Sequence, residues 1–68
     1  MIFQKNYNYK MTLNAILVED EEQSRAILKN YLTKYCPKVN ILGEAANVNE
    51  ALELIRTLDL DLVFLDVE

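Results

Sequence analysis

The stretch that decides the fold is Asn14-Ala15-Ile16-Leu17-Val18-Glu19-Asp20, a short apolar run that ends in two acids. It predicts a buried strand over residues 14–18 that leads directly into carboxylates. A second run of the same kind, Leu62-Val63-Phe64-Leu65, ends in Asp66. An uninterrupted apolar run is typical of a strand that is covered on both faces, so residues 62–65 predict another such strand.

Two amphipathic segments lie between these strands. Residues 21–35 carry apolar side chains at helical spacing, which predicts a helix with this buried face: Ile27, Leu28, Tyr31, Leu32 and Tyr35. Asp20 stands at the N-cap position with Gln23 three residues later, and Pro37 ends the helix.

The second segment repeats this design. Asn47 is a predicted N-cap with Glu50 at the matching position, and it opens a helix with this buried face: Ala51, Leu52, Ile55 and Leu58. Residues 39–45 alternate well enough to predict a strand between the two helices. The resulting order, β-α-β-α-β, predicts an open α/β sheet of parallel strands joined by right-handed crossovers.

Composition excludes several classes of function. The 68 residues are 51% hydrophobic with one Gly and one Pro, which is typical of a globular chain. The absence of His excludes histidine acid–base catalysis and most zinc sites, and a single Cys excludes an internal disulfide. The net charge of −4 argues against nucleic-acid binding by the chain itself. Apolar runs of four residues cannot cross a membrane, so we expect a cytoplasmic protein.

The acids that follow the strands form the candidate site. In open α/β sheets the site lies beyond the carboxyl ends of the strands, so Glu19, Asp20 and Asp66 meet there if the first and third strands are neighbours. Like charges that close need a cation among them, and ligands that are all oxygen suit Mg²⁺. A carboxylate beside Mg²⁺ can act as a nucleophile on a phosphoryl group.

Each acid taken alone has a simpler explanation. An acidic run at a helix start stabilises the helix dipole, and an Asp after a hydrophobic strand is often only the polar end of a buried segment. The joint pattern favours a site, because it requires acids after two strands that the β-α-β-α-β order brings to one edge.

The segments 14–22, 43–45, 49–52 and 62–68 together resemble the receiver domain of bacterial two-component response regulators. The first and last of them are most similar to receivers that precede a LytTR-type DNA-binding domain. The resemblance covers residues 11–68 and implies a truncated flavodoxin-like open parallel sheet with strand order 2-1-3. We therefore expect residues 13–68 to be the N-terminal half of a receiver, cut after the third strand, and residues 1–12 to be a disordered or extended N-terminal extension.

The resemblance also implies roles for individual residues. Asp66 matches the aspartate that receives a phosphoryl group from a histidine kinase. Asp20 matches the direct Mg²⁺ ligand, Glu19 its companion, and Glu68 the residue whose backbone carbonyl contacts the metal. Glu19 is a departure, since the family usually has Asp at that position.

The resemblance further implies a signalling module that is not an enzyme. Its partners would be a sensor histidine kinase and a second receiver, and DNA would be reached only through an output domain absent from this chain. The family's fourth-strand Ser/Thr and fifth-strand Lys are also absent. We therefore expect residues 1–68 to be weakly folded and unable to switch.

Two alternatives stay open. The chain could be a complete, non-catalytic half-receiver that acts as an interaction or dimerisation protein through the open edge of its third strand. It could also be the first half of another open-sheet domain that binds a nucleotide or cofactor. The second alternative is weaker, because no glycine-rich turn follows the first strand.

Overall fold

The computed structural model describes residues 1–4 and 11–66. Its helices and strands follow the predicted alternation, with one further strand at the N-terminus: β1 (Ile2–Gln4), β2 (Leu13–Glu19), α1 (Glu22–Tyr35), β3 (Val39–Ala45), α2 (Val48–Thr57) and β4 (Leu62–Asp66). The small α/β fold expected from the sequence is thus confirmed.

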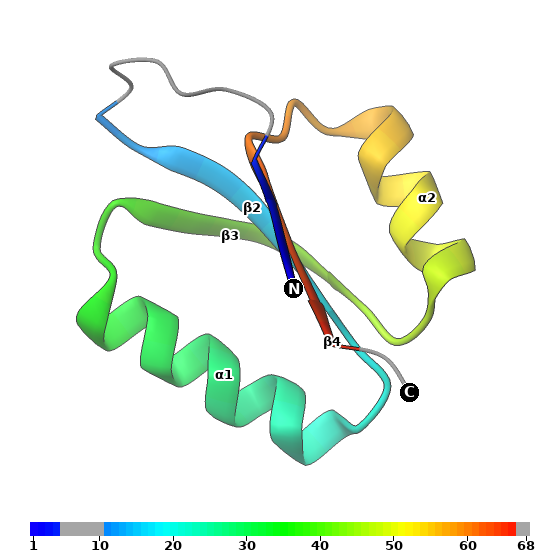
Figure 1. Cartoon of the computed structure of the whole chain (residues 1–68), viewed down its shortest axis with the longest axis horizontal. Helices are drawn as coiled ribbons and strands as arrows, with labels where there is room; N and C mark the ends of the chain where they lie inside the picture. The colour runs from blue at the N-terminus through cyan, green and yellow to red at the C-terminus, as the bar shows by residue number, and fades with distance from the viewer. Residues whose placement is uncertain (5–10, 67–68) are drawn as a thin grey trace.

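The strands form one mixed sheet in the order β1-β4-β2-β3 (Figure 1). β2 pairs in parallel with β3 on one side and with β4 on the other. These three strands have the neighbours expected for a truncated flavodoxin-like sheet. The order 2-1-3 is nevertheless wrong for the sheet as a whole, because β1 adds a fourth, antiparallel strand beside β4.

β1 covers an edge that the sequence predicted to be open. Ile2 pairs with Phe64, and the amino group of Met1 donates to the Leu65 carbonyl at 2.9 Å. The Leu65 N–H donates in turn to the Met1 carbonyl at 2.8 Å. Within the expected extension 1–12, residues 2–4 are therefore a paired strand, while residues 5–10 lie outside the described part of the chain.

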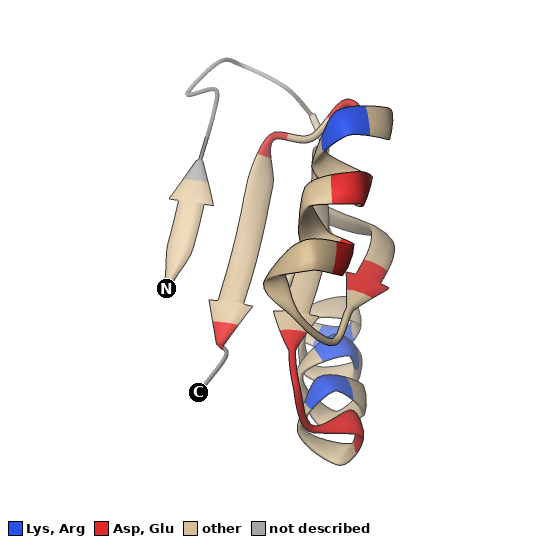
Figure 2. Ribbon diagram, turned by 90° about the vertical axis from the view of Figure 1, so that its right-hand side faces the viewer, with Lys and Arg blue, Asp and Glu red and all other residues tan. Residues whose placement is uncertain are grey.

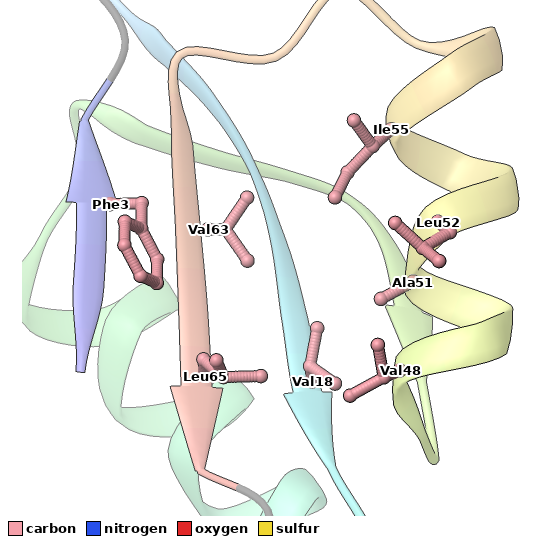
Figure 3. A pocket seen from close by; sticks show the side chains of 8 residues that line it. All are labelled: Phe3, Val18, Val48, Ala51, Leu52, Ile55, Val63 and Leu65. Atoms are coloured by element: carbon pink, nitrogen blue, oxygen red, sulfur yellow. The ribbon is translucent and has the colours of Figure 1, made fainter.

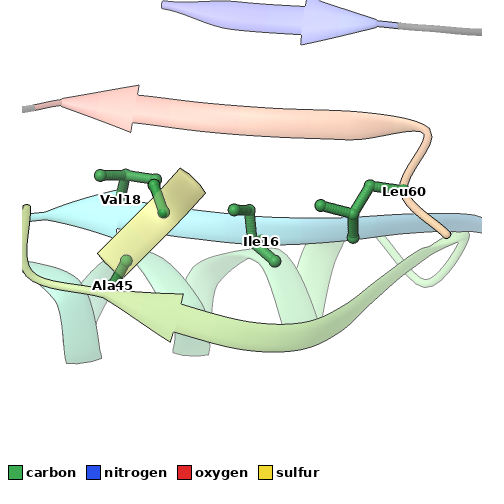
Figure 4. Packing of buried hydrophobic residues seen from close by; sticks show 5 residues of the cluster. Ile16, Val18, Ala45 and Leu60 are labelled. Atoms are coloured by element: carbon green, nitrogen blue, oxygen red, sulfur yellow. The ribbon is translucent and has the colours of Figure 1, made fainter. Parts of the chain in front are cut away.

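The two helices lie on opposite faces of the sheet (Figure 1). On the α2 face a buried cluster joins β2, β3, α2 and the segment just before β4: Ile16, Val18, Ala45, Ala51 and Leu60. Figure 4 shows this cluster and labels all of its members except Ala51. Alternation along β2 directs Ala15 and Leu17 to the α1 face, where both side chains are fully buried. Leu32 of α1 is also buried, with 5% of its surface exposed. β2 is therefore the centre of the core.

The buried faces of the helices are narrower than predicted. Tyr31 and Tyr35, predicted to be core residues, are 57% and 61% exposed, and Ile27 is exposed as well. On α2, Leu52 and Ile55 are also exposed, while Ala51, Leu54 and Leu58 pack on the sheet. The reason is geometric: each helix crosses only part of a small sheet, so the outer apolar positions of its stripe extend past the strands.

Only one of the two predicted helix caps is present. Asn47 Oδ1 accepts from the Glu50 N–H at 2.9 Å, as predicted, and Glu50 Oε1 accepts from the Ala46 N–H at 2.8 Å. At α1 the prediction is wrong, because the N-cap residue is Glu21 and it makes no side-chain capping hydrogen bond. Asp20 precedes the cap, so its carboxylate does not serve the helix end.

Candidate functional site

The strands β2 and β4 end in acids at the same edge of the sheet. Glu19 is the last residue of β2, Asp66 is the last of β4, and the two are direct partners across the parallel pair. Neighbouring strands lie about 4.8 Å apart, so the side-chain carboxylates of two residues at paired positions are within reach of each other. Figure 2 shows the acidic residues at these two strand ends. The predicted convergence of Glu19 and Asp66 is confirmed.

A polar hollow of about 330 Å³ occupies this edge. Its walls hold three predicted site residues and two that the sequence pattern does not single out: Glu19, Asp20, Asp66, Glu21 and Ser24. Ser24 lies in the first turn of α1, and no motif or spacing in the sequence indicated it. Glu68, the remaining predicted ligand, lies outside the described residues.

Glu19 is the most constrained acid of the hollow. It is only 6% exposed, and its Oε1 accepts from the Glu21 N–H at 3.1 Å. That hydrogen bond favours the ionised form and lowers the pKa. Burial and the neighbouring Asp20 and Asp66 carboxylates outweigh it, so the pKa of Glu19 lies above the usual range of a glutamate. A cation in the hollow would relieve this conflict.

A positively charged side chain of α1, Arg25, lies beside the site. Arg25 Nη1 donates to the Glu19 carbonyl at 2.8 Å, and its Nε lies 3.4 Å from Glu44 Oε1 on β3. Lys29 Nζ contacts the other oxygen of Glu44 at 3.0 Å. Arg25 was not predicted as a site residue, since no motif of the sequence includes it.

The donor set of the hollow suits Mg²⁺, which prefers carboxylate oxygens and retains several waters. Asp20 and Asp66 are exposed and line the hollow, so they can reach a cation there, and the mostly buried Glu19 lines the same hollow. Among residues 1–4 and 11–66, no three acids are already placed as a closed metal cluster. The arrangement therefore fits an ion held by one or two carboxylates and water, rather than a cage of protein ligands.

A second hollow of about 230 Å³ lies on the α2 face (Figure 3). It is lined only by apolar side chains, from β1, β2, β4 and α2: Phe3, Val18, Val48, Ala51, Leu52, Ile55, Val63 and Leu65. It exists because α2 packs on β2 and β3 and leaves the β4 side of that face uncovered. No titratable group lines it, so it is not a candidate for chemistry.

Comparison with known proteins gives one informative match. The chain is 37% identical over 57 residues to the protein-glutamate methylesterase/protein-glutamine glutaminase of Geobacillus kaustophilus strain HTA426. The match covers 84% of this chain but only 16% of that relative's length. No protein-family model and no solved structure matches the chain. Together with the sheet topology, the match supports a receiver-like domain.

Across the described ranges 1–4 and 11–66, neither α1 nor α2 has the length and apolar character needed to cross a bilayer.

Proposed function

We propose that this chain is a phosphoacceptor module of the receiver type, in which Asp66 takes a phosphoryl group while Asp20 and Glu19 hold Mg²⁺. The observation that carries the proposal is the pairing of Glu19 with Asp66 at the carboxyl edge of the sheet, in one hollow with Asp20. Asp66 is exposed at the strand end, so a phosphodonor can reach its carboxylate.

The chemistry is a single displacement at phosphorus. A carboxylate oxygen of Asp66 forms a bond to the phosphorus while the bond to the donor, a phosphohistidine nitrogen or a small acyl phosphate, breaks. The product is an aspartyl phosphate. When bound, Mg²⁺ offsets the negative charge that the phosphoryl group brings to an already acidic site.

The partners and the cellular setting are part of the same proposal. We infer a sensor histidine kinase as the phosphodonor, a cytoplasmic location, and output through another domain, of the LytTR type if the resemblance of the first and last segments holds. The methylesterase and glutaminase activities belong to the Geobacillus relative, of which the matched region is a small part. For this chain we propose no enzymatic activity of its own.

Asp66→Asn tests the phosphoacceptor role. With Mg²⁺ and a small phosphodonor such as acetyl phosphate, the unmodified chain should gain one phosphoryl group by intact mass, and the variant should gain none. Asp59→Asn is the matched control, since Asp59 is an exposed aspartate just before β4, away from the hollow. Labelling that persists in Asp66→Asn, or that disappears in Asp59→Asn, would remove Asp66 from this role.

The alternative of dimerisation through an open strand edge has lost its main support. The edge of β4 is paired with β1, so a second chain could add there only after β1 is displaced. The nucleotide-binding alternative gains nothing either, because the hollow at the sheet edge is lined by four acids and one serine, which would repel phosphates without a metal.

A further inference from the structure

We propose that Arg25 is a positioning residue of the acidic site: it holds the turn between β2 and α1 so that Glu19 and Asp20 face Asp66 before a divalent cation binds. The inference deepens the proposed function and rests on it, since the cation concerned is the one that would assist phosphoryl transfer. Its direct consequence is a higher affinity of the site for Mg²⁺.

The Arg25 side chain contacts the turn at the residue that precedes Asp20. Its guanidinium Nη1 donates to the Glu19 carbonyl at 2.8 Å, just before Asp20. The backbone after Asp20 is held separately by the first hydrogen bond of α1, from the Arg25 N–H to the Glu21 carbonyl at 2.9 Å, which does not depend on the side chain. The side chain is only 19% exposed, so water competes weakly for its contact with the Glu19 carbonyl. The guanidinium thus ties the end of β2, next to the predicted metal ligand Asp20, to helix α1.

A residue of the sheet, Glu44, in turn holds the Arg25 guanidinium in place. Glu44 on β3 contacts Arg25 Nε through one carboxylate oxygen and Lys29 Nζ through the other. A guanidinium has donors in a planar fork, so it can serve a carbonyl and a carboxylate together, whereas an ammonium group is a single point charge. The contact with Glu44 therefore aims the Arg25 fork at the turn.

Repulsion among the acids makes it useful for the turn between β2 and α1 to be held in place. The hollow brings Glu19, Asp20 and Asp66 together, and their mutual repulsion favours any movement of the turn away from β4. A turn free to move must be ordered again when a cation binds, and this ordering lowers the affinity. A turn already held by Arg25 avoids that cost.

Mg²⁺ titration of the full chain by calorimetry tests the inference. Arg25→Gln should weaken Mg²⁺ binding by about tenfold or more, which is typical when a residue that orients metal ligands is lost. Lys29→Gln is the matched control: it removes the same charge from the same helix and from the same partner, Glu44, but Lys29 does not touch the turn. We expect this control to bind within about twofold of the unmodified chain, as for the loss of an exposed ion pair.

Arg25→Lys keeps the positive charge but changes the geometry of the hydrogen-bond donors. It also replaces Arg25→Gln as the test variant if Arg25→Gln does not fold. It should also bind Mg²⁺ more weakly than the unmodified chain, because Arg25 makes its two contacts through two different nitrogens, Nη1 and Nε, and the single nitrogen of a lysine does not reproduce that geometry. In phosphoryl labelling, both Arg25 variants should need more Mg²⁺ for half-maximal rate yet approach the unmodified rate at saturation.

Three results would overturn the inference: equal losses in Arg25→Gln and Lys29→Gln, full affinity in Arg25→Lys, or no Mg²⁺ binding by the unmodified chain. The phosphoacceptor function fails separately. If Mg²⁺ binding depends on Arg25 as described but Asp66 is never labelled, the positioning role stands and the proposed function does not.

Discussion

At the scale of single residues, Glu19 combines a buried position with a negative charge beside two other carboxylates. Because its pKa is raised in the folded state, the stability that it contributes is fully present below its unfolded pKa and is lost as the pH rises through its folded pKa. At pH 7 without metal, the ionised Glu19 side chain therefore lowers the stability of the folded state. Glu19→Gln should raise the melting temperature in EDTA at pH 7, since Gln Oε1 can still accept from the Glu21 N–H.

The gain in melting temperature should shrink or vanish at about pH 3, below the ordinary glutamate pKa of about 4.3, where Glu19 is mostly protonated in both states. Thermal unfolding followed by circular dichroism at the two pH values measures it. Glu22→Gln removes an exposed charge in the first turn of α1 and controls for the chain's overall acidity. The same gain at both pH values, or an equal gain in Glu22→Gln, would contradict the role given to Glu19.

The acids of the site could be predicted, but the cation that orients them could not. Glu19 and Asp66 follow apolar runs, and the register of parallel strands then brings them together without further information. Arg25 and Ser24 lie in the first turn of α1, and their position beside the strand ends depends on how α1 packs against β2 and β3. No local pattern of the sequence encodes that packing.

At the scale of elements, α2 depends on its N-cap. Asn47→Ala removes the acceptor for the Glu50 N–H and should lower the free energy of unfolding by about 1 kcal/mol. Asn49→Ala is the matched control, because Asn49 is an exposed residue inside the same helix and the chemical change is identical. Urea unfolding measures both variants. A loss in Asn49→Ala as large as that in Asn47→Ala would show that the cap is not the cause.

The helical periodicity of α1, in the spacing of Ile27, Tyr31 and Tyr35, predicted the helix but not which of its apolar side chains are buried. Tyr31 and Tyr35 instead lie on the exposed face with their ring centroids 5.0 Å apart. Helical spacing defines a stripe, whereas the width of the sheet decides how much of the stripe is buried.

At the scale of the whole molecule, the alternation of strands and helices was predictable and β1 was not. A strand of three residues has too short a pattern to be recognised, and its position depends on the β4 edge, about 60 residues away in the chain. β1 nevertheless changes the surface of the molecule, because it pairs the backbone groups along the edge of β4.

Deletion of residues 1–4 should therefore increase self-association, because the apolar strand β4 would then offer unpaired N–H and C=O groups to another chain. Sedimentation velocity over a concentration series measures this, with a shift toward dimers or larger species expected for the deletion. Phe3→Thr is the control, since it removes an apolar side chain from the α2-face hollow but leaves the strand able to pair. If Phe3→Thr associates as strongly as the deletion, the altered hollow rather than the β4 edge is responsible. If the deletion associates no more than the unmodified chain, β1 does not protect that edge.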